Sequence, residues 1–134
     1  MREERGQVAG DIVIREPFTL WGSVAGTVRV INGGKFYHRG AIYGNLIVEA
    51  GGRCHVFGHI QRNLVLFEDT KVIHSGFVGG DAINNGGRLF VDAGAKVNGK
   101  IKTRHDGKTR IESKTAREIE ADEAEREHKT YKLD

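Results

Sequence analysis

Six histidines and one cysteine are the side chains of this sequence best suited to bind a metal or to act as a nucleophile. Two of the histidines, His38 and His74, are 36 residues apart, and each is followed two residues later by a glycine. Ligands of one zinc ion must all lie within about 2 Å of it. Whether these two side chains can meet therefore depends on the elements that carry them.

Motifs that carry catalysis are missing from the sequence. It contains no G-x-S-x-G, no C-x-x-C and no H-E-x-x-H. A single cysteine excludes an intramolecular disulfide, and Cys54 falls in a regular apolar series, so we expect it to be a small core residue. We therefore expect no catalytic residue, no metal, no cofactor and no small-molecule substrate.

The elements are indicated by an internal repeat of 18 residues. Glycines recur at this spacing: Gly22, Gly40, Gly58, Gly76 and Gly94. Apolar residues recur every six: Ile12, Phe18, Val24, Val30, Phe36, Ile42, Val48, Cys54, Ile60, Leu66, Val72 and Val78. Three hexads in each 18 residues predict three short strands per coil, each with an apolar side chain facing a common axis. The fold class expected is all-β, a three-sided β-solenoid with 18-residue coils.

Stacked coils lie about 4.8 Å apart, so like residues form columns. His38 and His74 would then share a column at a separation of about 9.6 Å, which is too far for one zinc ion to bridge. We expect both to lie at corners of the solenoid. Glycines at the corners are expected to supply positive φ angles that strands lack.

Three segments are predicted along the chain: a polar N-terminal lead over 1–9, the solenoid over 10–112, and a C-terminal helix or tail over 113–134. Thr115 and Glu118 form a capping box for that helix, which we expect to cover the last coil. Its thin apolar content argues against deep burial.

The repeat weakens after Gly79, where the next apolar slot falls on Asn84. Two registers compete over 80–102. Either a polar coil keeps the 18-residue spacing, or the chain slips. We favour the slip, because the regular spacing would bury Lys96. The slipped register places these residues inward: Leu89, Val91, Val97 and Ile101.

Charge is unevenly distributed around a formal net value of +3. Residues 99–117 carry seven Lys/Arg against two Asp/Glu, but no aromatic residue, so we expect no nucleic-acid partner. Residues 118–134 carry three against seven. The absence of an 18-residue apolar run and the charged beginning of the sequence favour a cytoplasmic location, with membrane association only indirect.

The phrases LIVEAGGRCHVFGHI and LFVDAGAKVNGKI share the elements L-x-V-x-x-G-(A/G) and V-x-G-x-I, which are separated by three residues in the first phrase and by one in the second. Over about residues 10–102 the chain thereby resembles bactofilins, the bacterial polymer-forming cytoskeletal proteins. The resemblance implies a right-handed three-sided β-helix that polymerises end to end without nucleotide, into filaments attached to membranes or partners. A non-catalytic, self-associating scaffold is accordingly the first hypothesis for function.

Two enzyme families with similar repeats are remote alternatives. The spacing of His38 and His74 is similar to that of zinc histidines in gamma-class carbonic anhydrases, but the companion ligand would fall at Gly79. Left-handed hexapeptide acyltransferases also have three hexads per coil, with long catalytic loops. Here every coil closes in 18 residues, which leaves no room for such a loop.

Outward positions beside the glycine column are unusually apolar and aromatic. The tentative binding patch consists of Trp21, Arg39, Phe57, His59 and Phe77. One interpretation is ordinary strand composition, since β-propensity places such residues on both faces. The other is a protein-binding face, since Trp, Phe and Arg are typical interface anchors. The alternative function is therefore a rigid solenoid that binds one specific protein, for example as a toxin-neutralising immunity protein.

Overall fold

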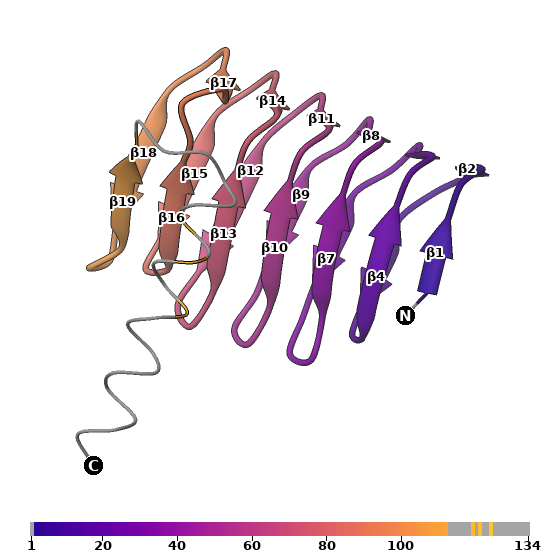
Figure 1. Ribbon diagram of the computed structural model, residues 1–134, viewed down its shortest axis with the longest axis horizontal. Coiled ribbons are helices and arrows are strands. Elements are labelled where there is room, and N and C mark those ends of the chain that lie inside the picture. Colours follow the sequence, from indigo (N-terminus) through magenta and orange to yellow (C-terminus); the bar gives the residue numbers. More distant parts are fainter. Residues whose placement is uncertain (1, 113–118, 120, 122–123, 125–134) are drawn as a thin grey trace.

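The protein is a parallel β-solenoid of three sheets, as shown by a computed structural model that describes residues 2–112, 119, 121 and 124. Its coils stack in sequence order along the long axis, from β1 at one end to β19 at the other (Figure 1). The prediction of an all-β, three-sided solenoid is confirmed, and the middle coils pair at the predicted spacing, as in Phe36↔Cys54 and Ile42↔Ile60.

Each complete coil contributes one strand to each sheet, and β19 adds a seventh strand to sheet A. Sheet A contains β1 (Arg2–Glu4), β4 (Pro17–Leu20), β7 (Lys35–His38), β10 (Arg53–Val56), β13 (Lys71–His74), β16 (Arg88–Val91) and β19 (Lys108–Ile111). Sheet B contains β2 (Gln7–Val8), β5 (Ser23–Val24), β8 (Ala41–Ile42), β11 (His59–Ile60), β14 (Phe77–Val78) and β17 (Lys96–Val97). Sheet C contains β3 (Ile12–Ile14), β6 (Val28–Val30), β9 (Leu46–Val48), β12 (Leu64–Phe67), β15 (Ala82–Asn85) and β18 (Ile101–Arg104).

The apolar series of hexads forms the core. From Val24 to Val78 its members are buried, and the two earlier members, Ile12 and Phe18, are partly buried against the same cluster. Strands in sheets A and C are long enough to turn a second side chain inward, two residues after the hexad residue in sheet A, as with Cys54 and Val56, and two residues before it in the middle strands of sheet C, as with Leu46 and Val48. The core is therefore wider than one apolar residue per strand, which is all that the hexad spacing indicates.

The solenoid begins before Gly10, its expected start. In the segment predicted as a polar lead, β1 pairs with β4 and β2 pairs with β5. The first coil is two residues shorter than the middle coils, since Arg2 pairs with Phe18, whereas Phe18 pairs with Phe36. Because the first coil is shorter, β1 does not appear in a search at the regular period of 18 residues. The charged side chains of β1 face outward or lie at the open end of the solenoid.

The region after Gly79 combines both of the competing registers. Asn84 pairs with Leu66 at the regular spacing of 18, so the chain keeps its register through β15. The slip follows, because Leu89 pairs with Val72 at an offset of 17 and Val97 with Val78 at 19. Leu89 and Val91 are buried as predicted, and Lys96 is exposed. The two registers are therefore not alternatives: the polar coil at Asn84 keeps the regular spacing, and the slip comes after it.

Asn84 is fully buried, and its amide makes hydrogen bonds that replace apolar packing. Its Nδ2 donates to the carbonyl oxygen of Gly87 at 3.0 Å, to that of Lys108 at 3.1 Å and to Oγ1 of Thr109 at 3.0 Å. Its Oδ1 accepts from the backbone N–H of Gly87 at 2.8 Å. The side chain thus holds the slipped corner and the last coil together, at the point where the apolar repeat stops.

The glycine column lies at the corner between sheets A and B, and its cause is close packing. A Cβ on Gly40 or Gly58 would collide with the carbonyl oxygen of the glycine one coil earlier. None of the four aligned glycines, Gly22, Gly40, Gly58 and Gly76, has a positive φ, so the expected conformational reason was wrong. Gly94 lies outside the column, because the offset here is 19 and a Cβ on it meets only a side-chain atom at 3.6 Å.

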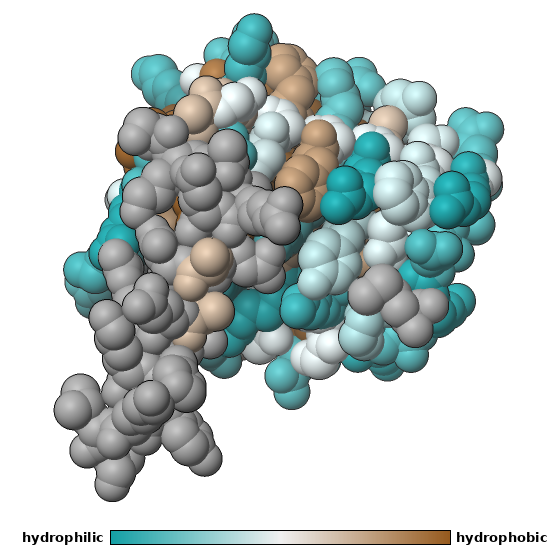
Figure 2. Space-filling model, in the orientation of Figure 1, coloured by the Kyte–Doolittle hydropathy of each residue, from teal (hydrophilic) through white to brown (hydrophobic). Residues whose placement is uncertain are grey.

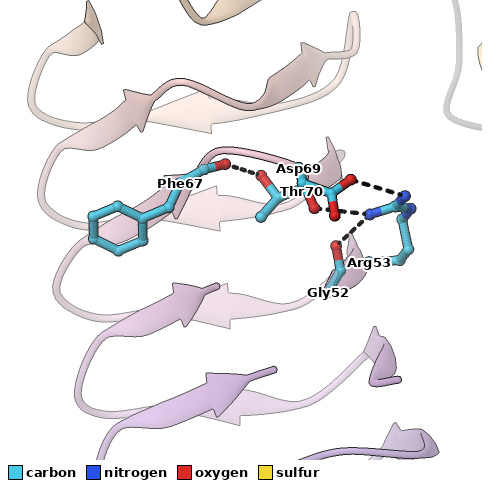
Figure 3. Close-up of polar contacts among 5 residues, drawn as sticks. All are labelled: Gly52, Arg53, Phe67, Asp69 and Thr70. Atoms are coloured by element: carbon cyan, nitrogen blue, oxygen red, sulfur yellow. Dashed lines mark hydrogen bonds and ion pairs between the residues drawn. The ribbon is translucent and has the colours of Figure 1, made fainter. Parts of the chain in front are cut away.

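Positive φ occurs instead at the corner between sheets C and A. Gly33 (89°) and Gly51 (87°) take this position in successive coils, and Asp69 (55°) takes it in the next. Figure 3 shows how side chains support this corner: Nη1 of Arg53 donates to the carbonyl oxygen of Asp69 at 3.2 Å, and Thr70 donates from Oγ1 to Phe67 at 2.6 Å. These bonds help to hold a non-glycine residue in the left-handed region, which carries a steric cost for an L-residue.

A ladder of polar side chains joins the corners between sheets B and C. In each step a side-chain oxygen accepts a hydrogen bond from the backbone N–H of the equivalent residue one coil later. Asn63 N–H donates to Oδ1 of Asn45 at 2.9 Å, and Asp81 N–H donates to Oδ1 of Asn63 at 2.8 Å. The N–H of Lys100 donates to Asp81 at 2.8 Å, and this bond lowers the pKa of the Asp81 carboxyl. The ladder satisfies backbone groups that the tight corners leave outside the sheets.

The predicted helix over 113–129 lies almost entirely outside the described residues and stays a prediction. Ile119 is described: it is buried in a small cluster with Ile73 of β13 and Phe90 of β16. Both partners point outward from sheet A, so this contact covers a side of the solenoid. The helix was expected to cover the last coil, and the described contact of Ile119 lies on the outer face of sheet A, at β13 and at the last-coil strand β16.

Candidate functional sites

The first candidate site is a column of stacked side chains at the corner between sheets A and B. Trp21, Arg39 and Phe57 occupy equivalent positions in three successive coils. The Cζ atom of Arg39 lies 5.3 Å from the Trp21 ring centroid and 4.5 Å from that of Phe57. Trp21 remains 42% exposed and Phe57 36%. The structure therefore brings three of the five predicted patch residues into one contact series, which we call the corner column.

Arg5 extends the corner column by one coil and was missed from the sequence. Its Cζ atom lies 5.1 Å from the Trp21 ring centroid, and Trp21 Nε1 donates a hydrogen bond to Glu3 at 3.3 Å. Arg5 precedes Trp21 by the short offset of the first coil, the same as in Gln7↔Ser23, so a search at the regular period passes over it. The resulting order of arginine, tryptophan, arginine and phenylalanine is an alternating cation and aromatic stack.

The other two predicted patch residues stack on the opposite side of the glycine column. The rings of His59 and Phe77 have centroids 4.6 Å apart. Sheet A adds a neighbouring pair, Tyr37 and His55, at 5.4 Å, and His55 lies 5.8 Å from Phe57. Figure 2 shows the outer face of sheet A, where hydrophobic side chains are interspersed among hydrophilic ones. The aromatic surface is thus broader than the predicted patch and mixed in polarity.

His38 and His74 are inside the solenoid, so the prediction that they are corner residues was wrong. Both are fully buried, in the second inward position of their sheet A strands. Nε2 of His38 donates to the carbonyl oxygen of His59 at 2.9 Å, and Nε2 of His74 donates to that of Lys96 at 3.0 Å. Each ring ties sheet A of one coil to sheet B of the next.

The burial of these rings changes their acid–base chemistry. Desolvation lowers the pKa of His38 from 6.5 to about 4, and it also lowers the pKa of His74. Nδ1 of each ring has no hydrogen-bond partner among the described residues. The rings are therefore neutral near pH 7 and act as structural hydrogen-bond donors.

The described part of the chain offers few candidates for a metal site or a reactive thiol. No three His, Cys, Asp or Glu residues in that part cluster closely enough to hold a metal ion. Cys54 is buried in the core, and burial raises the pKa of its thiol well above the usual range. The predicted role of Cys54 as a small core residue fits this position.

The second candidate site is formed by the two ends of the solenoid. Six apolar residues that pack against the core remain partly exposed: Val8, Ile12, Phe18, Ala95, Val97 and Ile101. The first three lie at the β1 end, where a hollow of about 720 Å³ opens, and the last three lie in the last coil. Among the described residues, β1, β2, β3, β17, β18 and β19 each have a strand neighbour on one side only. Within residues 2–112, both ends thus present unpaired strand edges around a core that no described coil seals.

Comparisons with known proteins add no family to these observations. No family model matches the sequence, and no curated protein or solved structure is similar enough to count as a match. In the described residues, no helix is long and apolar enough to cross a membrane.

Proposed function

We propose that this chain is a non-catalytic structural scaffold that associates with further copies of itself end to end. The proposal includes the bactofilin-like character, the right-handed coil and the cytoplasmic location that the sequence led us to expect. It requires no nucleotide and no cofactor, because the association would use only surfaces that the folded chain already presents.

The observation that carries this proposal is the contrast between sealed middle coils and unsealed ends. From Val24 to Val78 the hexad side chains are fully or almost fully buried, whereas the six partly exposed core residues all lie at the two ends. An unpaired strand edge readily accepts another strand, and a solenoid end carries three such edges side by side. A second copy seated on an end would pair those edges and bury the exposed apolar side chains.

The test is the particle size of the purified protein as a function of concentration. We expect assemblies that pellet on ultracentrifugation and appear as filaments under negative stain. Fibre diffraction of such filaments should show a meridional spacing of about 4.8 Å from stacked strands. A sharp monomer peak throughout the accessible concentration range would refute the proposal.

The corner column favours a second candidate, a rigid solenoid that binds one specific protein. Trp21 and Phe57 are exposed aromatic rings held in place by Arg39, and rigid aromatic and arginine side chains are frequent interface anchors. Because the sheet corner is already ordered, a partner would bind it with little loss of conformational entropy. A toxin-neutralising immunity protein is one function of this kind.

Alanine substitutions test this second candidate. After recovery of a partner by pull-down, Trp21→Ala and Phe57→Ala should each weaken its binding by about 2 kcal/mol or more. Phe67→Ala is the matched control, because Phe67 is similarly exposed (40%) but lies in sheet C. Unchanged affinity in both corner variants, with the fold intact, would show that the column is ordinary strand surface.

A further inference from the structure

We infer that the outer face of sheet A binds acidic protein segments that carry an aliphatic anchor residue, and that a partner protein supplies such a segment at β7 and β10. This inference rests on the second candidate function and names the chemistry of the partner. It follows from the segment that already occupies the neighbouring strands, from the cations along the face and from the aromatic rings that stay accessible between them.

The outward side chains in the middle of sheet A form one column, in which neighbours pair in register: Tyr37, His55, Ile73 and Phe90. At β13 and β16 this column is closed, since Ile73 and Phe90 are buried and pack against Ile119. At β7 and β10 the column is only half-buried, and no described residue closes it. The four strands lie side by side (Figure 1), so the face has a covered half at β13 and β16 and an open half at β7 and β10.

The sequence around Ile119 shows which chemistry the covered half accepts. Residues 118–125 contain five Asp/Glu and no Lys or Arg, and Ile119 is the single large apolar residue among them. An aliphatic side chain from an acidic stretch of chain is thus buried in the apolar column. The occupant of the covered half is therefore an acidic segment with one aliphatic anchor.

Basic side chains extend along both halves of the face. None of the strands β7, β10, β13 and β16 contains an Asp or Glu, and each begins with an outward-facing cation: Lys35, Arg53, Lys71 and Arg88, which share one register column. Arg39 adds a positive charge at the opposite edge, in the corner column. Asp69 lies 3.9 Å from Arg53 and offsets one of these charges. The remaining positive charge favours acidic segments on the open half as well as on the covered half.

The open half also offers rings against which an aliphatic side chain can pack. The ring centroids of Tyr37 and His55 are 5.4 Å apart, and that of Phe57 lies 5.8 Å from His55. Nζ of Lys35 lies 5.6 Å from the Tyr37 ring centroid, so a cation stands beside the rings. Phe57 also contacts Arg39, which joins the open half and the corner column into one surface. A partner segment of the stated composition would bury its anchor on these rings and place its carboxylates beside the cations.

A synthetic peptide with the sequence of residues 116–127 is the probe, added to the full-length protein. Fluorescence anisotropy of the labelled peptide measures binding. The emission of Trp21 reports occupation of the open half, because the peptide contains no tryptophan and Trp21 belongs to the adjoining corner column. We expect saturable binding with a shift in Trp21 emission. Added salt should weaken the binding, since it screens the attraction between opposite charges.

Matched variants separate the contributions of anchor, charge and position. Ile119→Ser in the peptide should weaken binding about tenfold or more, because an aliphatic side chain is no longer buried. A peptide whose carboxylates are replaced by amides should bind at least about fivefold more weakly, as should Lys35→Glu in the protein. Arg62→Glu is the control, since it reverses an exposed arginine at another corner and should leave binding unchanged. Lys35 is also exposed, so both protein variants should fold, which far-UV circular dichroism checks.

Three results would overturn the inference. Lack of saturable binding would show that the open half does not accept an acidic segment. Equal binding of the amide peptide would exclude charge as the cause. Binding that is insensitive to Lys35→Glu and leaves Trp21 emission unchanged would place the peptide elsewhere, for example in exchange with the chain's own segment on the covered half.

The second candidate function is judged separately, by the affinity of a recovered partner for Trp21→Ala. A partner that depends on Trp21 but binds through a segment without acidic residues would overturn the inference and leave that function standing. A peptide that binds as expected, together with a recovered partner that is indifferent to Trp21→Ala and Phe57→Ala, would support the acidic-segment face and refute the corner column as the interface.

Discussion

The middle coils and the last coils solve the same stacking problem by different means. Between β4 and β15 the offset from coil to coil is constant, and an apolar side chain or a glycine meets its own kind in the next coil. Beyond β15 the offsets become 17, 19 and 20, and the asparagine network of Asn84 replaces an apolar slot. Repetition specifies register where every coil is equivalent. Directed hydrogen bonds specify it where coils are not.

The largest expected effect comes from the glycine column of the middle coils. In Gly58→Ala the new Cβ would collide with the carbonyl oxygen of Gly40, and the backbone can relieve this only by separating two coils. We expect the free energy of unfolding to fall by more than about 4 kcal/mol, which is in the range of the most disruptive substitutions. Gly94→Ala is the matched variant outside the column and should be nearly neutral. Equal stabilities of the two variants in urea denaturation would contradict the steric explanation.

The next effect concerns the hydrogen-bond network of the last coils. Asn84→Ala leaves the N–H of Gly87 and the carbonyl oxygen of Lys108 without their side-chain partner and opens a cavity. We expect Asn84→Ala to lower the free energy of unfolding by about 3 to 4 kcal/mol. Thr103→Ala, which removes an exposed hydroxyl bonded to Thr109 at 2.8 Å, is a control expected to cost about 1 kcal/mol or less. Hydrogen exchange should show the loss of protection concentrated in β15, β16 and β19, and loss spread evenly over all coils would argue against a local role.

Acid should destabilise the protein through its buried histidines. The folded-state pKa of His38 is about 4 and its ordinary value is 6.5, so between these values the unfolded chain binds a proton that the folded chain does not. Stability should therefore fall as the pH decreases from about 6.5 to about 4, by up to about 3 kcal/mol for this residue. The titratable side chains that act on the His38 ring are His59 and His74, and Asp92 acts on His74.

His38→Val tests this prediction, because Val56 occupies the same inward column one coil later. The variant should lose part of the acid sensitivity, although it also loses the bond to the carbonyl oxygen of His59. His105→Asn is the matched control, because His105 is exposed and asparagine tolerates its positive φ. Thermal unfolding at pH 4, 5, 6 and 7 measures the difference, and parallel profiles for His38→Val and the wild type would exclude His38 as its source.

The smallest effect is expected at the corner column. Arg39→Gln removes the cation between Trp21 and Phe57, and exposed cation–aromatic contacts contribute about 0.5 to 1 kcal/mol each. Arg62→Gln is the control, since Arg62 is an exposed arginine at another corner. The emission of Trp21, the single tryptophan, should shift in the first variant alone. No shift would mean that Arg39 does not order the ring in solution.

Much of this fold can be predicted from the sequence, because in a stack of similar coils two residues separated by one coil length lie directly above one another. The hexads identify one core residue per strand from Ile12 to Val78, and the glycines identify the tightest corner. The aromatic patch was also accessible, since Trp21, Arg39 and Phe57 recur at the period of the coil and must therefore stack. These features follow from the repeat length alone, and the sequence shows that length directly.

Two features could be read only from the tertiary structure: the length of each corner, and the identity of the second inward-facing residue of each strand. A corner shortened by one or two residues moves every later contact, so β1 and Arg5 are invisible at a fixed period. The slip was predicted from the weakened repeat, but only the structure placed it after Asn85. The hexads likewise omit the side chain two residues after each slot in sheet A, which is where His38 and His74 turn inward. A strand alternates its side chains between two faces, so a four-residue strand buries two of them. Spacing therefore showed that these histidines share a column, and only the packed coil placed that column inside.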